Sequence, residues 1–192
     1  MGAAKFIVSG QDKKQLSQVK NVLSSGGYIF VGYCSDPMSL MRHIRGIQPE
    51  LLVLDISGSF KDLKQILQVI DDELLSACIL LLESRNDEVF EFMKTTRTVS
   101  YITKPVTDYI LFQIADMSMS NFIRVREYEE KLRYLSNTLE NRKIIEKAKW
   151  ILVEQDGYTE AEAYNVIRKK SRDNRIAMNE VAEAIIIAKG CS

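Results

Sequence analysis

Cysteine and histidine are scarce in this chain of 192 residues, which contains three cysteines and a single histidine. Cys34, Cys78 and Cys191 show no metal-ligand spacing, and His43 stands alone in the sequence. These numbers and spacings argue against a zinc site and exclude a disulfide framework. Cys34 and Cys78 lie in apolar surroundings, which is typical of buried thiols in a reducing compartment, so we expect a cytoplasmic protein.

Long apolar runs and glycine-rich loops are absent as well. No stretch approaches the roughly 18 apolar residues of a membrane-spanning helix, and the opening MGAAKFIVSGQDKK has no apolar run of the length found in signal peptides. We therefore expect no membrane partner. Because no glycine-rich phosphate loop is present, a nucleotide-dependent enzyme is disfavoured. We expect no enzymatic activity, no catalytic residues and no resident metal or cofactor. Lys plus Arg equals Asp plus Glu at 26 each, so the net charge indicates no partner.

Apolar runs and helix-periodic segments alternate through the first hundred residues. The run ELLVLDIS is apolar up to Asp55, as in a central parallel strand that is buried on both faces. Five strands alternating with helices predict an α/β fold with a doubly wound, five-stranded parallel sheet. The predicted strands cover residues 5–10, 28–34, 50–57, 77–84 and 99–105, and the predicted helices cover 15–27, 37–46, 61–73 and 86–96.

Three charged residues fall at the ends of predicted strands. Asp55, Glu83 and Lys104 each follow or close an apolar run. Ligands of doubly wound sheets bind at the carboxyl ends of the strands, so these side chains form a candidate site. The same residues could instead form an ion pair at the strand ends, either Asp55 with Lys104 or Glu83 with Lys104.

The motifs LLVLDIS and YITKP resemble the receiver domain of bacterial response regulators, over residues 5 to about 120. The resemblance implies a flavodoxin-like fold, with Asp55 at the position of the phosphoacceptor and Lys104 at that of the lysine that contacts the phosphoryl group. Ser9 and Gly10 stand where the family has a magnesium-binding acidic pair, and Glu83 stands where it has a hydroxyl. We therefore expect residues 1–120 to form a degenerate receiver-like domain.

Magnesium is the one metal that the resemblance to receiver domains suggests. Mg²⁺ requires several hard oxygen ligands, and Asp55 alone is a poor cage, although Asp12 or Glu83 could supply part of one. We expect Mg²⁺ only if Asp55 is phosphorylated. A conventional phosphorylation-activated regulator that uses Asp55, with a sensor kinase as partner, is the alternative to a receiver controlled by another regulatory protein or a small ligand.

One long helix is predicted from Val106 to about Gln155, because this stretch lacks proline and glycine. Within it, apolar residues recur with the a and d spacing of a coiled coil. We interpret residues 121–141 as a linker helix that forms a parallel dimeric coiled coil, and so expect a homodimer. Antiparallel pairing, or packing of this helix on its own receiver domain, remains open. The predicted seam consists of Val125, Tyr128, Leu132, Leu135 and Leu139.

The heptad pattern stops at Arg142, and the apolar stripe moves to another face of the same helix. Asp156-Gly157 then ends the helix, and Thr159 with Glu162 predicts a capping box for the next one. A further helix is predicted at about 177–189. Three short amphipathic faces over residues 142–192 predict a small three-helix bundle. Its closest helix contacts are expected at Ala148, Ala163 and Ala182.

The stretch ENRKIIEKAKWILVEQDGYTEAEAYNVIR and its continuation, residues about 131–190, are similar to the ANTAR domain, the RNA-binding module of AmiR- and NasR-type transcription antitermination regulators. The resemblance implies that the chain binds RNA, namely paired stem-loops with hexanucleotide loops in nascent mRNA leaders, and so promotes read-through. Trp150 departs from the glycine usual in the family, and Arg172 from a methionine. A module that docks another protein without RNA is the alternative.

Basic residues of this region can neutralise phosphate, and arginine or aromatic planes can stack on splayed bases. The run RKKSRDNR, residues 168–175, holds five positive side chains and one negative. Tyr164 is either a stacking residue or part of the bundle core, and Arg142 could pair with Glu146. The candidate RNA-binding residues are Arg142, Lys143, Lys147, Lys149, Trp150, Arg168, Lys169, Arg172 and Arg175.

Overall fold

The computed structural model describes residues 3–56 and 60–189. The chain divides into two compact units, Met1–Tyr128 and Glu129–Ser192, and each is described by itself. Ser57, the last residue of a predicted strand, and Cys191 lie outside the described residues. No helix in the described ranges has the length and apolarity to span a bilayer.

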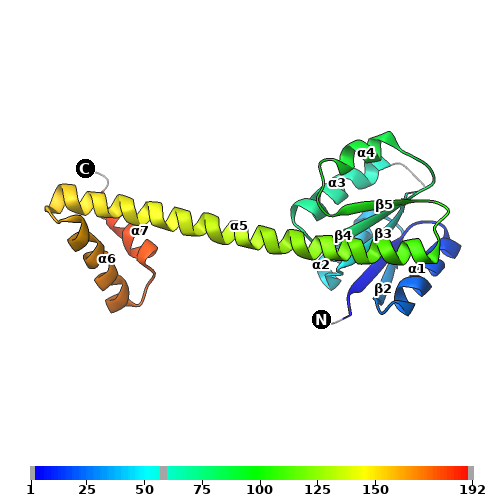
Figure 1. Cartoon of the computed structure of the whole chain (residues 1–192), viewed down its shortest axis with the longest axis horizontal. Coiled ribbons are helices and arrows are strands. Elements are labelled where there is room, and N and C mark those ends of the chain that lie inside the picture. Colours follow the sequence, from blue (N-terminus) through cyan, green and yellow to red (C-terminus); the bar gives the residue numbers. More distant parts are fainter. Residues whose placement is uncertain (1–2, 57–59, 190–192) are drawn as a thin grey trace. The chain divides into compact units, whose positions relative to one another are not determined.

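A parallel sheet of five strands forms the centre of the first unit, as described over residues 3–56 and 60–128, in the order β2-β1-β3-β4-β5 (Figure 1). Its middle strands are buried along their whole length, which explains their uninterrupted apolar sequence. The predicted flavodoxin-like fold is confirmed. The strands are β1 Lys5–Ser9, β2 Ile29–Cys34, β3 Leu51–Ile56, β4 Ala77–Leu82 and β5 Val99–Thr103.

The helices between these strands are α1 Lys13–Ser25, α2 Pro37–Ile47, α3 Phe60–Asp72 and α4 Asp87–Met93. Apolar residues of α2, α3 and α4 pack on one face of the sheet, whereas α1 and the first part of the next helix, α5 (Asp108–Asp156), pack on the other. Each predicted helix and strand is present, with ends that differ by a few residues. This agreement follows from the strong helical and strand periodicities of the sequence.

Helix α5 is continuous over 49 residues, as the absence of proline and glycine predicts. Its last turns pack in the second unit with α6, Glu160–Asn174, and α7, Met178–Lys189. The predicted capping box is present, because Thr159 Oγ1 accepts a hydrogen bond from the backbone N–H of Glu162 and the Glu162 carboxylate accepts one from the backbone N–H of Thr159. This double cap fixes the start of α6.

The core of the second unit is built on small side chains. Ala148, Ala163 and Ala182, one from each helix, are completely buried. Larger apolar residues, among them Leu152 and Ile167, fill the space around them. An alanine at each close approach allows the three helix backbones to come near one another, as the sequence predicts.

Candidate functional site

The charged residues at the strand ends of the first unit form one ion cluster. Asp55 is the penultimate residue of β3, Glu83 follows β4 and Lys104 follows β5, so three neighbouring strands bring them to one edge of the sheet. Lys104 Nζ lies 2.7 Å from Asp55 Oδ1 and 2.6 Å from Glu83 Oε1. The two ion pairs that the sequence offered as alternatives are therefore both present, and they share one ammonium group.

Burial differs across this cluster. The side chain of Asp55 is 0% exposed and that of Lys104 is 13% exposed, whereas Glu83 is largely in solvent. Partial burial lowers the pKa of Lys104, but hydrogen bonds and charge attraction from Asp55 and Glu83 outweigh it, so this pKa is raised above its ordinary value. Apart from Lys104, no donor among the described residues satisfies the buried carboxylate oxygens of Asp55. Within the described residues, Lys104 is thus the group that compensates that charge.

Gly10 marks the main departure from a metal-binding receiver site. A Cβ atom built on Gly10 would lie 2.6 Å from Cβ of Asp55, so this backbone has no room for an aspartate at that position. Asp12 is engaged elsewhere, because its carboxylate accepts hydrogen bonds from the backbone N–H groups of Lys14 and Gln15 at the start of α1. Asp12 is therefore a helix cap and not the spare ligand that the sequence allowed.

The residues of this edge do not fit a magnesium ion. Glu83 is held by Lys104, and within residues 3–56 and 60–189 no group of three acidic, histidine or cysteine side chains is placed to hold a metal. A hard cation would therefore find Asp55 as its one nearby buried carboxylate, which is already neutralised by an ammonium group. Asp12 and Glu83 therefore do not complete a Mg²⁺ cage around Asp55 among the described side chains.

Candidate RNA-binding residues gather on the outer face of α6. Tyr164, Arg168 and Arg172 are spaced by four, so they lie in one row on the helix. All three are exposed, and the opposite side of α6 buries Ala163 and Ile167 in the core. Tyr164 is thus a surface residue and not part of the core, which was one of its two interpretations.

The cations of this surface are not paired. Among the described side chains, no carboxylate lies within ion-pair distance of Arg168, Lys169, Arg172 or Arg175. Arg175 follows the last turn of α6 in a left-handed conformation, with φ of 55°, and caps the helix through its backbone N–H. These cations can therefore meet an anionic partner without first breaking an ion pair.

Lys149 of α5 is arranged differently. Its side chain is 13% exposed, and its ammonium group donates to both oxygens of Glu146 at 2.9 and 3.0 Å. The hydrogen bond to Glu146 raises the pKa of Lys149; burial acts in the opposite direction, and the charges of Glu146, Glu160 and Tyr164 raise it further. Lys149 therefore lies beside α6, and Glu146 pairs with it and not with Arg142.

Two other predicted cations of α5 lie on a different side of the bundle. Lys143 and Lys147 line a groove together with Ile187 and other residues of α7. Lys143 is also 3.8 Å from the carboxylate of Glu140, in an exposed pair. The predicted RNA-binding set is consequently split between an α6 side and an α7 side of the second unit.

Trp150 lies on the outer face of α5. Its side chain is 55% exposed, and it follows Leu139 by eleven residues, or about three helical turns, so both point to the same side of the helix. Leu132, Leu135 and Leu139 are exposed, as is Tyr128, whereas Val125 is half-buried. Four of the five residues of the predicted coiled-coil seam are thus exposed to solvent in the single chain.

Comparison with known proteins agrees with both domains. Residues 133–186 match the model of the ANTAR domain, a range that begins within the predicted linker. The chain is 25% identical over 169 residues to the transcriptional regulatory protein PdtaR of Mycobacterium tuberculosis, covering 88% of this chain and 82% of that protein. It is also 35% identical over 65 residues to the nitrate regulatory protein of Klebsiella oxytoca, covering 34% of this chain and 16% of that protein.

Solved structures share the fold of the first unit. The receiver domain of the putative response regulator NarL from Mycobacterium tuberculosis aligns with a TM-score of 0.53 at 19% identity, covering 62% of this chain and 98% of that one. The receiver domain of a modulated diguanylate cyclase from Desulfovibrio desulfuricans aligns with a TM-score of 0.55 at 17% identity, covering 62% and 96%.

The chain therefore combines a domain of the receiver fold with a C-terminal ANTAR domain. This is the architecture of an ANTAR-type response regulator, a class of transcriptional regulators.

Proposed function

We propose that this chain is an RNA-binding transcription antitermination regulator, which recognises paired hexaloop hairpins in nascent mRNA leaders through residues 142–192. The observation that carries the proposal is the row of Tyr164, Arg168 and Arg172 on α6, which is exposed and whose two arginines have no carboxylate partner among the described residues. Arginine guanidinium groups bind phosphate and stack on unpaired loop bases, and an exposed tyrosine ring offers a further stacking surface.

The proposal includes a dimer. Leu132, Leu135 and Leu139 would cost free energy if they stayed in water, and a parallel coiled coil over residues 121–141 would bury them against the same residues of a second copy. Two copies would present two ANTAR domains, which matches an RNA target with two hairpins. The receiver-like domain, residues 1–120, would then control dimerisation or receive the input.

The input is proposed to be something other than ordinary phosphorylation of Asp55. Phosphoryl transfer to an aspartate depends on a metal ion that neutralises charge, and the close approach of Gly10 to Asp55 leaves no place for the usual acidic ligand. The pairing of Lys104 with Asp55 and Glu83 further occupies the ammonium group that would contact a phosphoryl oxygen. No enzymatic activity is proposed.

A gel-shift titration of the full chain tests the RNA-binding proposal. The probe is an RNA with two hexaloop hairpins, and the controls are a single-hairpin RNA and a double hairpin with scrambled loops. We expect the double hairpin to bind at least about tenfold more tightly than either control, because two linked sites add avidity. We also expect affinity to fall steeply with salt, since phosphate contacts release counterions. Equal affinity for all three RNAs would contradict the proposal.

A conventional phosphorylation-activated regulator remains the second candidate, because Asp55 keeps the position and the lysine contact of a phosphoacceptor. The same titration distinguishes the two, when repeated with magnesium and a phosphoryl analogue such as beryllium fluoride. Binding that requires the analogue would favour the second candidate and overturn the degenerate receiver.

A further inference from the structure

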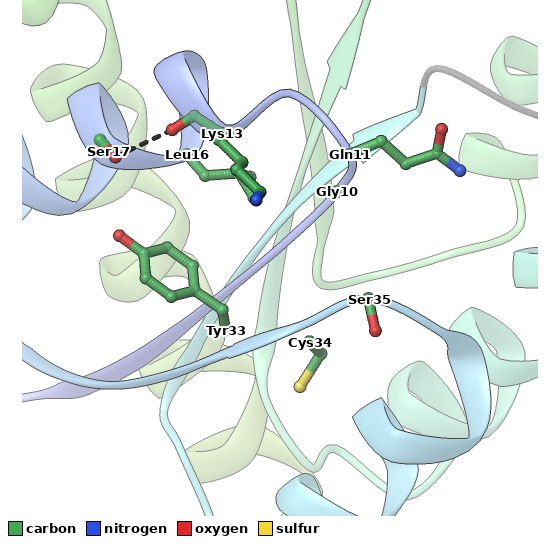
Figure 2. Close-up of a pocket in the computed structure, with 8 residues that line it drawn as sticks. All are labelled: Gly10, Gln11, Lys13, Leu16, Ser17, Tyr33, Cys34 and Ser35. Carbon is green, nitrogen blue, oxygen red and sulfur yellow. Dashed lines mark hydrogen bonds between the residues drawn. The ribbon is translucent and has the colours of Figure 1, made fainter.

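A pocket of about 640 Å³ opens in the first unit, between the start of α1 and the end of β2 (Figure 2). Its volume lies within the roughly 300–1,000 Å³ of typical small-molecule sites. Gly10 and Gln11 form one end, and Ser35, which directly follows β2, lines another part. This pocket is separate from the RNA-binding surface, because it is formed entirely by the receiver-like domain.

The pocket combines an apolar wall with a single cation among its lining residues. Leu16 is buried and lines one side, and the ring of Tyr33 lines another. The Tyr33 ring packs against Phe30 with 4.7 Å between centroids, which holds it in place before any ligand arrives. Figure 2 shows the Lys13 side chain running along the pocket near Leu16, whereas the Gln11 side chain points away.

Lys13 supplies positive charge without a competing partner. Among the described residues, no carboxylate lies within ion-pair distance of Lys13. The hydroxyl of Ser17 donates to the backbone oxygen of Lys13, so its lone pairs can still accept a hydrogen bond.

The Cys34 thiol is a poor nucleophile in this pocket. Burial raises the pKa of the Cys34 thiol, and its sulfur points away from Lys13 in Figure 2. The chemistry of the pocket is therefore that of reversible binding.

We propose that this pocket binds a small aromatic carboxylate as an input to the receiver-like domain. The flat body of the ligand stacks on the Tyr33 ring and covers Leu16, and its carboxylate pairs with the Lys13 ammonium. An aromatic ring favours contact with another ring of fixed orientation, and a carboxylate–ammonium hydrogen bond is stronger than a neutral one. A ligand that lacks the ring does not cover Tyr33 and Leu16, and a ligand that lacks the charge does not pair with Lys13.

Gly10 connects the pocket to the strand-end cluster. It lines the large pocket and also a smaller one of about 200 Å³, whose wall includes the buried Asp55. Because Gly10 lies against Asp55 so closely, a ligand that shifts the loop after β1 also shifts the packing around the Asp55–Lys104 ion pair. Ligand binding thus reaches the position where a phosphoryl group acts in ordinary receivers.

The test uses naphthoate as the probe and the full chain as the protein. Naphthamide, which has the ring without the charge, and acetate, which has the charge without the ring, are the matched controls. We expect naphthoate to raise the melting temperature further with each increase of its concentration above the dissociation constant, and to shift backbone amide NMR signals of residues 10–17 and 33–35. No effect of naphthoate at millimolar concentration, or an equal effect of naphthamide, would overturn the proposal.

Two variants locate the binding to this pocket. Lys13→Met removes the cation and should weaken naphthoate binding about tenfold, as expected for one charge-assisted hydrogen bond. Lys14→Met is the control, because Lys14 is the next residue of α1 and does not line the pocket. Equal binding to both variants would show that the acid binds elsewhere. Neither experiment contains RNA, so the outcome is independent of the RNA-binding proposal.

Discussion

The strand-end cluster of the first unit and the α6 surface of the second use charge in opposite ways. Asp55, Lys104 and Glu83 neutralise one another, and the first two are buried. Arg168 and Arg172 of α6 are exposed and have no carboxylate partner among the residues that the structure describes. The difference shows that the residues most suggestive of chemistry are internally satisfied, whereas the residues available to a partner are ordinary cations on a helix.

Removing one charged side chain should affect the strand-end cluster and the α6 surface differently. A buried carboxylate that loses its only cation becomes an uncompensated charge in a medium of low polarity. An exposed arginine that is removed leaves the fold unchanged, because water already solvates its charge. Substitutions in the buried strand-end cluster should therefore change stability, and those on α6 should change binding alone.

The largest effect is expected for Lys104→Met. It leaves Asp55 without compensation and should lower the free energy of unfolding by about 3 kcal/mol, the lower end of the range for broken buried ion pairs. Lys94→Met is the matched control, because Lys94 makes an equally short but exposed pair with Glu91. Chemical denaturation of both variants measures the difference. A similar loss of stability in the two variants would contradict the distinction between buried and exposed charges.

Lys104→Met should also change how the free energy of unfolding depends on pH. The pKa of Lys104 is raised in the folded chain, so its contribution to stability is fully present below the unfolded lysine pKa of about 10.4 and is lost as the pH rises through the higher folded value. We expect the wild-type chain to lose this stability in strongly alkaline solution and Lys104→Met to lack that decline. Unfolding curves measured across this range provide the check.

Next in size is the double substitution Arg168→Ala with Arg172→Ala. Each arginine can make a charge-assisted hydrogen bond of about 1.5 kcal/mol, so RNA affinity should fall about hundredfold in total, with helicity unchanged. The slope of log affinity against log salt should become shallower by about 0.7 for each lost phosphate contact. Gel-shift titration at several salt concentrations measures both quantities.

The control for this pair lies in the other unit. Lys61 and Lys64 are exposed cations one turn apart on α3, so Lys61→Ala with Lys64→Ala removes the same charge from the whole chain. If both doubles weakened RNA binding equally, net charge and not the α6 surface would explain the affinity.

A third test concerns the exposed apolar stripe of α5. Leu135→Glu should weaken dimerisation by about 2 kcal/mol per dimer, because Leu135 is 55% exposed in the single chain and burying that part is worth about 1 kcal/mol in each of the two chains. Asn137→Glu is the control, since Asn137 lies away from the stripe and receives the same charge. Sedimentation across a range of concentrations measures the dimer fraction. An unchanged dimer in Leu135→Glu would exclude this stripe as the seam.

Much of the fold and part of the site could be predicted from the sequence. The convergence of Asp55, Glu83 and Lys104 follows from topology, because the carboxyl ends of parallel strands meet at one edge. The three buried alanines follow from helical periodicity within amphipathic helices. Both predictions depend on patterns that are local in the sequence.

The remaining features depend on contacts that no local pattern encodes. Gly10 touches Asp55 across 45 residues of sequence, and this approach decides whether a metal ligand could stand there. Glu146 had Arg142 and Lys149 as partners within one turn on either side, and the choice between them rests on how Lys149 packs beside α6. Asp12 is the exception, because an aspartate directly before a helical segment is a recognisable cap.

The smallest effect is expected for Glu146→Gln. This variant tests whether a paired lysine of the ANTAR domain is less available to RNA than the exposed arginines of α6. Glu146 accepts from two of the three N–H donors of the Lys149 ammonium, so an RNA phosphate at Lys149 must compete with it. An i, i+3 ion pair on a helix is worth about 0.2–0.5 kcal/mol, which predicts about a twofold gain in RNA affinity.

Glu140→Gln is the matched control for this gain, because Glu140 lies two turns earlier on α5 and its contact with Lys143 is 3.8 Å long. The gain in Glu146→Gln should vanish in the double variant Glu146→Gln with Lys149→Met, since the freed cation is then absent. A gain that persists there, or that Glu140→Gln reproduces, would mean that Glu146 acts by general repulsion of RNA. Lys149 would then be a structural residue beside α6, and the RNA-binding surface would consist of the α6 row without it.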